Sequence, residues 1–276
     1  MQRPGSGFFP SAMTKIRRRP AETAGFYREV LSALKQGRVP FMVGGAYALA
    51  HYTGVMRETQ DLDLFLERRH LSAALDCLSA ISCRRELTFP HWLAKARRGR
   101  NVVDLIFNSG NGVAAVDSAW FSHAASGTVL GIRVAISPVE EMIWSKAFIM
   151  ERRRFDGADV LHLLRARLER LSWTRLLARF DRNWPVLLAH LVLFGFVYPR
   201  EGQRIPTEVM RELVDRLERQ RSEPVVEDGL CRGTLLSRSH YFVDVEKWGL
   251  GDVRLGPETN MTQEDIERWT AADGRH

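Results

Sequence analysis

FMVGGAYALAHYTGVMRETQDLDLF, residues 41–65, contains the clearest structural pattern in this chain. Its apolar start stops at two glycines, after which an alanine- and leucine-rich helix is expected over Ala46–Tyr52. Polar and apolar residues then alternate over Thr59–Leu66, which is typical of a strand with one face in the core. Asp61 and Asp63 share the other face, about 6–7 Å apart given a rise of about 3.3 Å per residue.

The two aspartates and the two glycines suit a metal ion and a phosphate. Neighbouring carboxylates repel each other unless a cation joins them, and magnesium takes one or two carboxylates together with phosphate oxygens. Gly44 and Gly45 follow an apolar strand and open a helix, whose N-terminus favours an anion and whose backbone can approach a phosphate closely. The pattern therefore indicates a site for a magnesium ion and a phosphate group.

Asp104 is the third candidate carboxylate. It lies in the apolar run VVDLIF, residues 102–107, where a lone charge is costly unless it faces a cleft or a cation. Three carboxylates can hold two metal ions, which clamp the attacking and leaving oxygens of an in-line displacement. Capping of a strand end is the alternative role for Asp104.

In this order the motifs resemble the nucleotidyltransferase superfamily of DNA polymerase beta type. Its mark is a hydrophobic residue with Gly-Gly or Gly-Ser, a helix, Asp-x-Asp and a later carboxylate. Within it the chain looks like the bacterial AbiEii-like and related minimal nucleotidyltransferases, through Val43-Gly44-Gly45-x-Ala-x-Ala and Arg57-x-Thr59-x-Asp61-Leu-Asp63. A later segment resembles the family's helical part, with Ser137-Pro138-x-Glu140-Glu141, then Lys146, then Arg154-x-Asp156-x-x-Asp159. The resemblance spans about residues 38–165.

The resemblance implies a role for each matching residue. The metal ligands would be Asp61, Asp63 and Asp104, with two Mg²⁺ ions expected and Mn²⁺ as a substitute; Asp104 could instead be the base for the attacking hydroxyl. These three and Lys146 would be the catalytic residues. A nucleoside triphosphate, the expected substrate, would be bound by Gly44, Gly45, Arg57, Thr59, Lys146 and Asp159. Asp156 or Asp159 would orient Lys146, which could otherwise be an ordinary surface residue of a helix.

The remaining sequence predicts further strands and helices. Strands are expected at 38–43, 84–89, 102–107, 128–136 and 241–245, with a basic loop that carries Lys95, Arg97, Arg98 and Arg100 between the second and third of these. Helices are expected at 24–34, 71–81, 138–152, 156–168, 173–180, 185–197 and 206–219. Ser137 is expected to cap the helix that follows Pro138, and Thr262 with Asp265 to form a capping box.

These elements predict an α/β (α+β) fold, in which a small mixed sheet with flanking helices is followed by a helical region. We expect a disordered basic tail over residues 1–22 and a nucleotidyltransferase domain over 23–137. A helical region that completes the cleft would cover 138–220, and a mixed extension of unknown role would cover 221–276.

Composition narrows the class of protein. With 45% hydrophobic and 26% charged residues, the chain suits a globular protein with a real core. The net charge of +7 suits an anionic partner such as a nucleotide or RNA without requiring one. The three cysteines form no paired motif, and neither a signal peptide nor a membrane span is evident, so a cytoplasmic protein is expected.

The acceptor of the nucleotide stays open at the level of sequence. The resemblance and the basic bias favour tRNA or another RNA, as in toxin-type members, which would bring an antitoxin protein as partner. A small molecule such as an aminoglycoside is the second candidate. A non-catalytic nucleotide-binding module of the same fold is the third, although its Asp-x-Asp would then be expected to have been lost. A basic cleft would favour RNA, and an acidic one a cationic drug.

Overall fold

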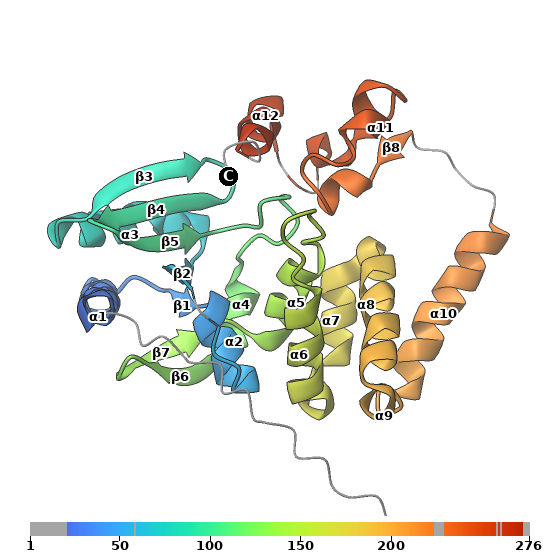
Figure 1. Ribbon diagram of the computed structural model, residues 1–276, viewed down its shortest axis with the longest axis horizontal. Helices are drawn as coiled ribbons and strands as arrows, with labels where there is room; N and C mark the ends of the chain where they lie inside the picture. The colour runs from blue at the N-terminus through green and yellow to red at the C-terminus, as the bar shows by residue number, and fades with distance from the viewer. Residues whose placement is uncertain (1–20, 58, 224–228, 258, 260, 273–276) are drawn as a thin grey trace, which may run out of the picture.

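The computed structural model describes residues 21–57, 59–223, 229–257, 259 and 261–272. Seven strands form one mixed sheet in the order β3–β4–β5–β2–β1–β7–β6 (Figure 1). Their bounds are β1 (Met42–Val43), β2 (Asp61–Phe65), β3 (Arg84–Phe89), β4 (Leu93–Arg98), β5 (Asn101–Ile106), β6 (Ala125–Val129) and β7 (Ile132–Ile136). The expected fold class, a mixed sheet with flanking helices and a following helical region, is confirmed.

Helices flank the sheet and then continue away from it. The first four are α1 (Ala21–Gln36), α2 (Gly45–Thr53), α3 (Leu71–Ala80) and α4 (Ser118–Ser122). The helical region consists of α5 (Val139–Ala147), α6 (Gly157–Arg167), α7 (Trp173–Phe180), α8 (Trp184–Val197), α9 (Pro199–Gly202) and α10 (Thr207–Ser222). The last segment holds β8 (Leu230–Cys231), α11 (Phe242–Glu246), β9 (Gly251–Asp252) and α12 (Gln263–Ala271), and it lies above the sheet and α5 in Figure 1.

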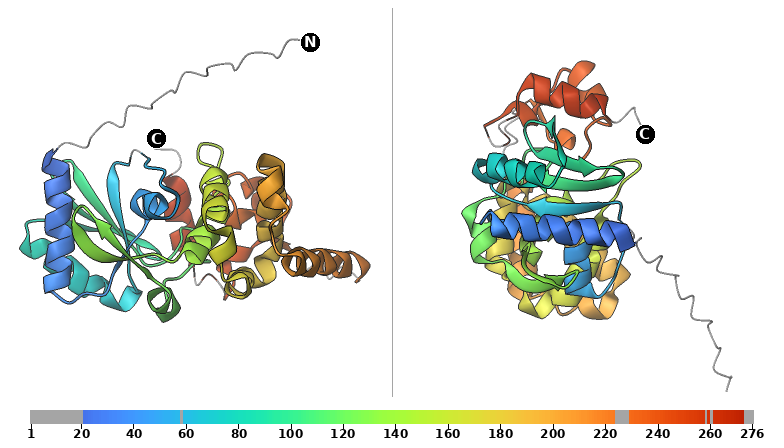
Figure 2. Two further views of the ribbon diagram at one scale, coloured as in Figure 1. Left: turned by 90° about the horizontal axis from the view of Figure 1, so that it is seen from below. Right: turned by 90° about the vertical axis from the view of Figure 1, so that its left-hand side faces the viewer.

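The sheet core follows from the alternation in β2. Leu62 and Leu64 are fully buried, whereas Asp61 and Asp63, which alternate with them, are half-buried. The leucines join the same core as Tyr27 and Leu31 of α1, and α1 and α3 pack on the sheet while α2 lies on its other side (Figure 2). Burial of apolar side chains on one face therefore places the carboxylates on the opposite face, as the alternation predicts.

The basic loop predicted after β3 is wrong, because residues 93–98 form β4. This strand lies between β3 and β5 and pairs antiparallel with both. Ala94 and Ala96 are fully buried, and Lys95 and Arg97 lie on the other face. The strand was not predicted because charged residues alternate there with alanines, which are only weakly apolar. Hydrogen bonding to a strand on each side stabilises β4 in spite of the small apolar area that the alanines bury.

Two other strand predictions need correction. The single strand expected over 128–136 is a hairpin of β6 and β7, because Leu130 and Gly131 both have positive φ angles, 51° and 83°, as a tight hairpin turn requires. The strand expected over 38–43 is reduced to β1, since the chain leaves α1 through Arg38 with a φ of 53°.

The helix predicted from Pro138 begins at Val139 and ends at Ala147. Pro138 occupies the N-cap position, so Ser137 is not the cap; its carbonyl oxygen instead accepts a hydrogen bond from the Tyr52 hydroxyl at 2.8 Å. Residues 241–245, predicted as a strand, belong mainly to helix α11. The predicted capping box of Thr262 and Asp265 is confirmed.

Residues 1–20 of the predicted tail lie outside the described residues, and α1 begins at Ala21. The cysteines Cys77, Cys83 and Cys231 are all reduced thiols. Among the helices of the described residues, none has the length and apolar character needed to cross a membrane.

Candidate active site

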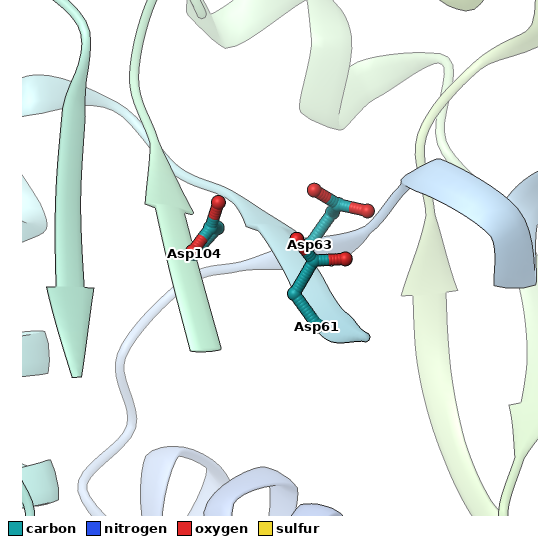
Figure 3. A group of neighbouring side chains, drawn as sticks. All are labelled: Asp61, Asp63 and Asp104. Atoms are coloured by element: carbon teal, nitrogen blue, oxygen red, sulfur yellow. The ribbon is translucent and has the colours of Figure 1, made fainter. Parts of the chain in front are cut away.

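The three predicted carboxylates come together on two neighbouring parallel strands. Asp61 and Asp63 lie on β2, and Asp104 lies on β5 directly opposite Asp63 in the register (Figure 3). One carboxylate oxygen from each residue can be chosen so that all three lie within 4.8 Å of one another. Because parallel pairing fixes this register, Asp104 lies beside the Asp-x-Asp pair.

Burial and neighbouring carboxylates raise the pKa values of Asp63 and Asp104. Burial raises the pKa of Asp63 to about 7, and the neighbouring carboxylates of Asp61 and Asp104 contribute to that rise. Burial also raises the pKa of Asp104, and the Lys95 ammonium opposes that effect. Three clustered carboxylates, two of them with a raised pKa, offer oxygen ligands that a hard divalent cation would stabilise in the ionised form.

Gly44 and Gly45 are required by the closeness of α2 to β2. The N–H of Gly44 donates to the Asp63 carbonyl oxygen at 3.0 Å. Gly45 has a φ of 53°, and a Cβ added to it would lie 1.7 Å from Oδ2 of Asp63. Only glycine fits this position, and it brings the N-terminus of α2 directly against the carboxylates.

Arg57 and Thr59, expected to bind the nucleotide, contact acidic groups of the site. The hydroxyl of Thr59 donates to Oδ1 of Asp61 at 2.6 Å, so it helps to orient that carboxylate. Nη2 of Arg57 lies 2.6 Å from Oδ1 of Asp159 on α6, and the Arg57 side chain is 43% exposed. Arg57 thus lies at the edge of the cleft, where a solvent-accessible cation can meet a ligand.

Lys146 on α5 pairs with both Asp156 and Asp159, whereas the sequence had left open which of the two orients it. Its Nζ lies 2.6 Å from Asp156 and 2.8 Å from Asp159. Arg154 donates two further hydrogen bonds to Asp156, at 3.0 and 3.1 Å. Two carboxylates therefore fix one lysine at the wall of the cleft.

Lys95 is the functional candidate that the sequence reasoning missed. It lies on β4 opposite Asp104, and its Nζ contacts both oxygens of that carboxylate at 2.8 and 2.9 Å. The only signal in the sequence was its place in a basic run, and without the pairing of β4 and β5 that run did not point to Asp104.

A cleft of about 930 Å³ joins these groups. One side is formed by α2, α5 and the start of α6, and it carries Gly45, Arg57 and Lys146. The other side is formed by β3, β4 and the C-terminal segment, which contributes Leu235, Arg238, Arg268, Trp269 and Ala272. The carboxylates lie between the two sides, as a reaction centre between two substrates would.

Comparison with known proteins gives only distant similarities. No family model matches the chain, and no curated protein matches its sequence. The chain is similar to the solution structure of the antibiotic-resistance factor ANT(2'')-Ia, at 16% identity over 62% of this chain and 97% of that one, with a TM-score of 0.43. An antigenic nucleotidyltransferase-like protein from Paracoccidioides brasiliensis is similar at 16% identity over 67% of this chain and 93% of that one, with a TM-score of 0.44. A tRNA-processing enzyme is similar at 14% identity over 93% of this chain and 79% of that one, with a TM-score of 0.32. At this distance, the activity has to be judged from the site itself.

Proposed function

We propose that this chain is a magnesium-dependent nucleotidyltransferase, which moves a nucleoside monophosphate from a triphosphate to a hydroxyl acceptor. The observation that carries the proposal is the cluster of Asp61, Asp63 and Asp104 directly in front of Gly45, at the start of α2. Carboxylate oxygens are ligands that Mg²⁺ prefers, and the N–H groups at a helix start bind phosphate. The cleft therefore offers adjoining places for the metal ion and for the triphosphate.

The reaction that fits this arrangement is an in-line displacement at the α-phosphorus. The acceptor oxygen bonds to phosphorus, the bond to the oxygen that bridges the α- and β-phosphates breaks, and pyrophosphate leaves with that oxygen. Asp104 is proposed to accept the hydroxyl proton. Magnesium at Asp61 and Asp63 would supply neutralisation of the charge on the phosphoryl oxygens.

Lys146 and Arg57 support the triphosphate side of this proposal. Lys146 is fixed by Asp156 and Asp159, and Arg57 also contacts Asp159, so both cations are held at the same wall of the cleft. We propose that they neutralise the charge that develops on the leaving pyrophosphate, and that Asp156 and Asp159 orient Lys146. Fixed cations of this kind act without reorganising during the reaction.

The acceptor side of the cleft is basic. The wall formed by β4 and the C-terminal segment carries Lys95, Arg97, Arg238 and Arg268. Within the cleft, Asp104 pairs with Lys95 and Glu151 pairs with Arg238, so the excess positive charge comes from Arg97 and Arg268, whose partners Glu86 and Glu264 lie outside the cleft lining. An anionic acceptor would be attracted to this wall, whereas a cationic aminoglycoside would be repelled. RNA is therefore the proposed acceptor class, and tRNA, as in the AbiEii-like proteins that the sequence resembles, is the first RNA to test.

The test is transfer of label from each α-labelled triphosphate to total RNA, tRNA or an aminoglycoside in the presence of magnesium. Labelled RNA is expected with the intact protein, and Asp63→Asn should reduce the rate by a factor of at least about a thousand, since loss of one electrostatic group costs about that much. Asp76→Asn is the matched control, because Asp76 is an exposed carboxylate of α3 paired with Arg85.

Three outcomes separate the alternatives. Label on the aminoglycoside alone would overturn the RNA assignment and leave nucleotidyl transfer standing. Magnesium-dependent binding of triphosphate without transfer to any acceptor would support a non-catalytic nucleotide-binding module. If neither binding nor transfer occurs, the proposed function is wrong.

A further inference from the structure

A row of charged residues crosses three neighbouring strands at the centre of the cleft. Asp63 on β2 lies opposite Asp104 on β5, and Asp104 lies opposite Lys95 on β4. The register of the sheet therefore places one cation next to the carboxylate cluster, and it does so through backbone pairing rather than through a mobile loop.

The contact between Lys95 and Asp104 is enclosed. Nζ of Lys95 lies 2.8 and 2.9 Å from the two oxygens of Asp104, and the two side chains are only 19% and 10% exposed. An ordinary surface lysine keeps its ammonium group in water. An ammonium group that is drawn into a cleft and shared between both oxygens of one carboxylate is instead a structural counterion of that carboxylate.

The choice of lysine at this position is informative. The chain contains five lysines and thirty-five arginines, so a cation that serves only as a surface charge is far more often arginine here. The cations that contact Asp104, and Asp156 together with Asp159, at less than 20% exposure are nevertheless lysines, Lys95 and Lys146. An ammonium group is a compact point charge, whereas a guanidinium group is planar and larger. At Asp104 the ammonium group contacts both carboxylate oxygens.

We propose that Lys95 is the permanent cation of Asp104, so that the site takes one metal ion, at Asp61 and Asp63, where two would be expected. The inference rests on the proposed function and refines it. Three carboxylates carry three negative charges, which one divalent ion and one lysine balance. A second ion would have to approach Asp104 to about 2.1 Å while Lys95 contacts both of its oxygens, and the two cations would repel each other.

Lys95 acts in this proposal as a positioning residue. Its ammonium group balances the charge of the Asp104 carboxylate, and its contacts with both oxygens fix the orientation of that carboxylate. The consequence is a metal requirement that saturates with a single ion.

The experiment counts Mn²⁺ ions bound per chain by electron paramagnetic resonance, with Mn²⁺ alone and with α,β-methylene analogues of the four common triphosphates. The intact protein is expected to bind one ion with the spectrum of an isolated ion. Lys95→Met is expected to bind two, with the spectrum of a coupled pair, because Asp104 is then available. Asp104→Asn, alone or combined with Lys95→Met, should bind one ion.

Arg97→Gln is the matched control, since Arg97 is the next cation on the same face of β4 and pairs with Glu86 at 3.1 Å. This variant is expected to bind one ion.

The variants also separate the two proposals. A coupled pair of ions in the intact protein, reduced to a single ion by Asp104→Asn, would overturn the inference about Lys95 and leave the proposed function intact. One ion in every variant, Lys95→Met included, would likewise overturn it, provided that circular dichroism shows a folded variant; should Lys95→Met not fold, the comparison of the intact protein with Asp104→Asn decides alone. Absence of any Mn²⁺ binding that depends on Asp63 would remove the proposed function itself.

Discussion

Gly45 and Asp63 approach each other so closely that neither can change without moving the other. A Cβ at Gly45 would lie 1.7 Å from Oδ2 and 2.6 Å from Cγ of Asp63, and the φ of 53° already disfavours any other residue. The glycine thus has two functions, a backbone conformation and an unobstructed approach of α2 to the carboxylates.

We predict that Gly45→Ala weakens the binding of Mn²⁺ and of triphosphate by at least about tenfold, because Asp63 must move away from the added methyl group. The left-handed conformation adds a loss of about 1–2 kcal/mol in the free energy of unfolding. Calorimetric titration and urea denaturation measure the two effects.

Gly54→Ala is the matched control for this substitution. Gly54 ends the same helix with a φ of 74°, and a Cβ there would meet no atom within 4 Å. It should show a similar loss of stability without loss of binding. Equal binding by the two variants would show that the contact with Asp63 is unimportant.

The raised pKa of Asp63 makes the free energy of unfolding depend on pH in the absence of metal. Its pKa is 3.8 in a model peptide and about 7 in the fold, so between these values the folded chain retains a proton that the unfolded chain has lost. The contribution of Asp63 to the free energy of unfolding therefore falls as pH rises from about 4 to 7, and it is constant above that range.

Asp63→Asn removes this contribution, so the variant should gain stability relative to the intact protein as pH rises from about 4 to 7. Urea denaturation in EDTA across this range measures the difference. Saturating Mg²⁺ should cancel the gain, since only the intact protein binds it tightly. A difference that is independent of pH would contradict the raised pKa.

At the scale of elements, the packing of α5 against α7 positions α5, the helix that carries Lys146 into the cleft. Glu140 and Glu141 in the first turn of α5 are buried, and they pair with Arg175 and Arg179 of α7. Arg179 also forms a bidentate contact with Asp117, the N-cap of α4, at 2.7 and 3.0 Å. The network therefore ties the helical region to the sheet side of the molecule.

We predict that Glu141→Ala lowers the free energy of unfolding by about 3 kcal/mol, because it removes the fully buried carboxylate that Arg175 and Arg179 share. Glu212→Ala, which removes a more exposed pair with Arg216 on α10, should cost only about 0.3–0.5 kcal/mol. Urea denaturation compares the two variants, and similar losses in both would show that burial of the network contributes nothing.

At the scale of the whole molecule, three parts meet around the cleft: the sheet, the helices from α5 onward and the C-terminal segment. The amide of Asn111 donates to the Leu235 carbonyl oxygen at 2.8 Å, and Glu151 binds Ser237 and Arg238. The ring of Trp269 on α12 packs on Gly110, leaving no space for a side chain there. These contacts hold Arg238 and Arg268 at the acceptor side.

If RNA is the acceptor, its binding should weaken with salt through this wall. We predict that Arg268→Gln reduces the slope of log affinity against log salt by about 0.7 for a single-stranded RNA, the value for one lost phosphate contact. Arg211→Gln on the exposed face of α10 should leave the slope unchanged. Fluorescence anisotropy across a salt series measures both, and equal slopes would place the RNA elsewhere.

The sequence was sufficient for features that depend on local order along the chain. Alternation in β2 placed Asp61 and Asp63 on one face, because successive side chains of a strand point to opposite sides. Gly44 and Gly45 predicted the turn into α2, and the capping box at Thr262 predicted the start of α12. The class of fold followed from such elements taken in order.

The features that required the tertiary structure are contacts between different strands and helices. The pairing of β2 with β5 brought Asp104 beside Asp63, and the hairpin of β4 and β5 brought Lys95 beside Asp104. The periodicity of β5 alone does not show which strand pairs with it. Folding of the helical region showed that Asp156 and Asp159 both hold Lys146. Burial and hydrogen bonding across the whole chain determine these pairings, so they cannot be predicted from the sequence of a single strand or helix.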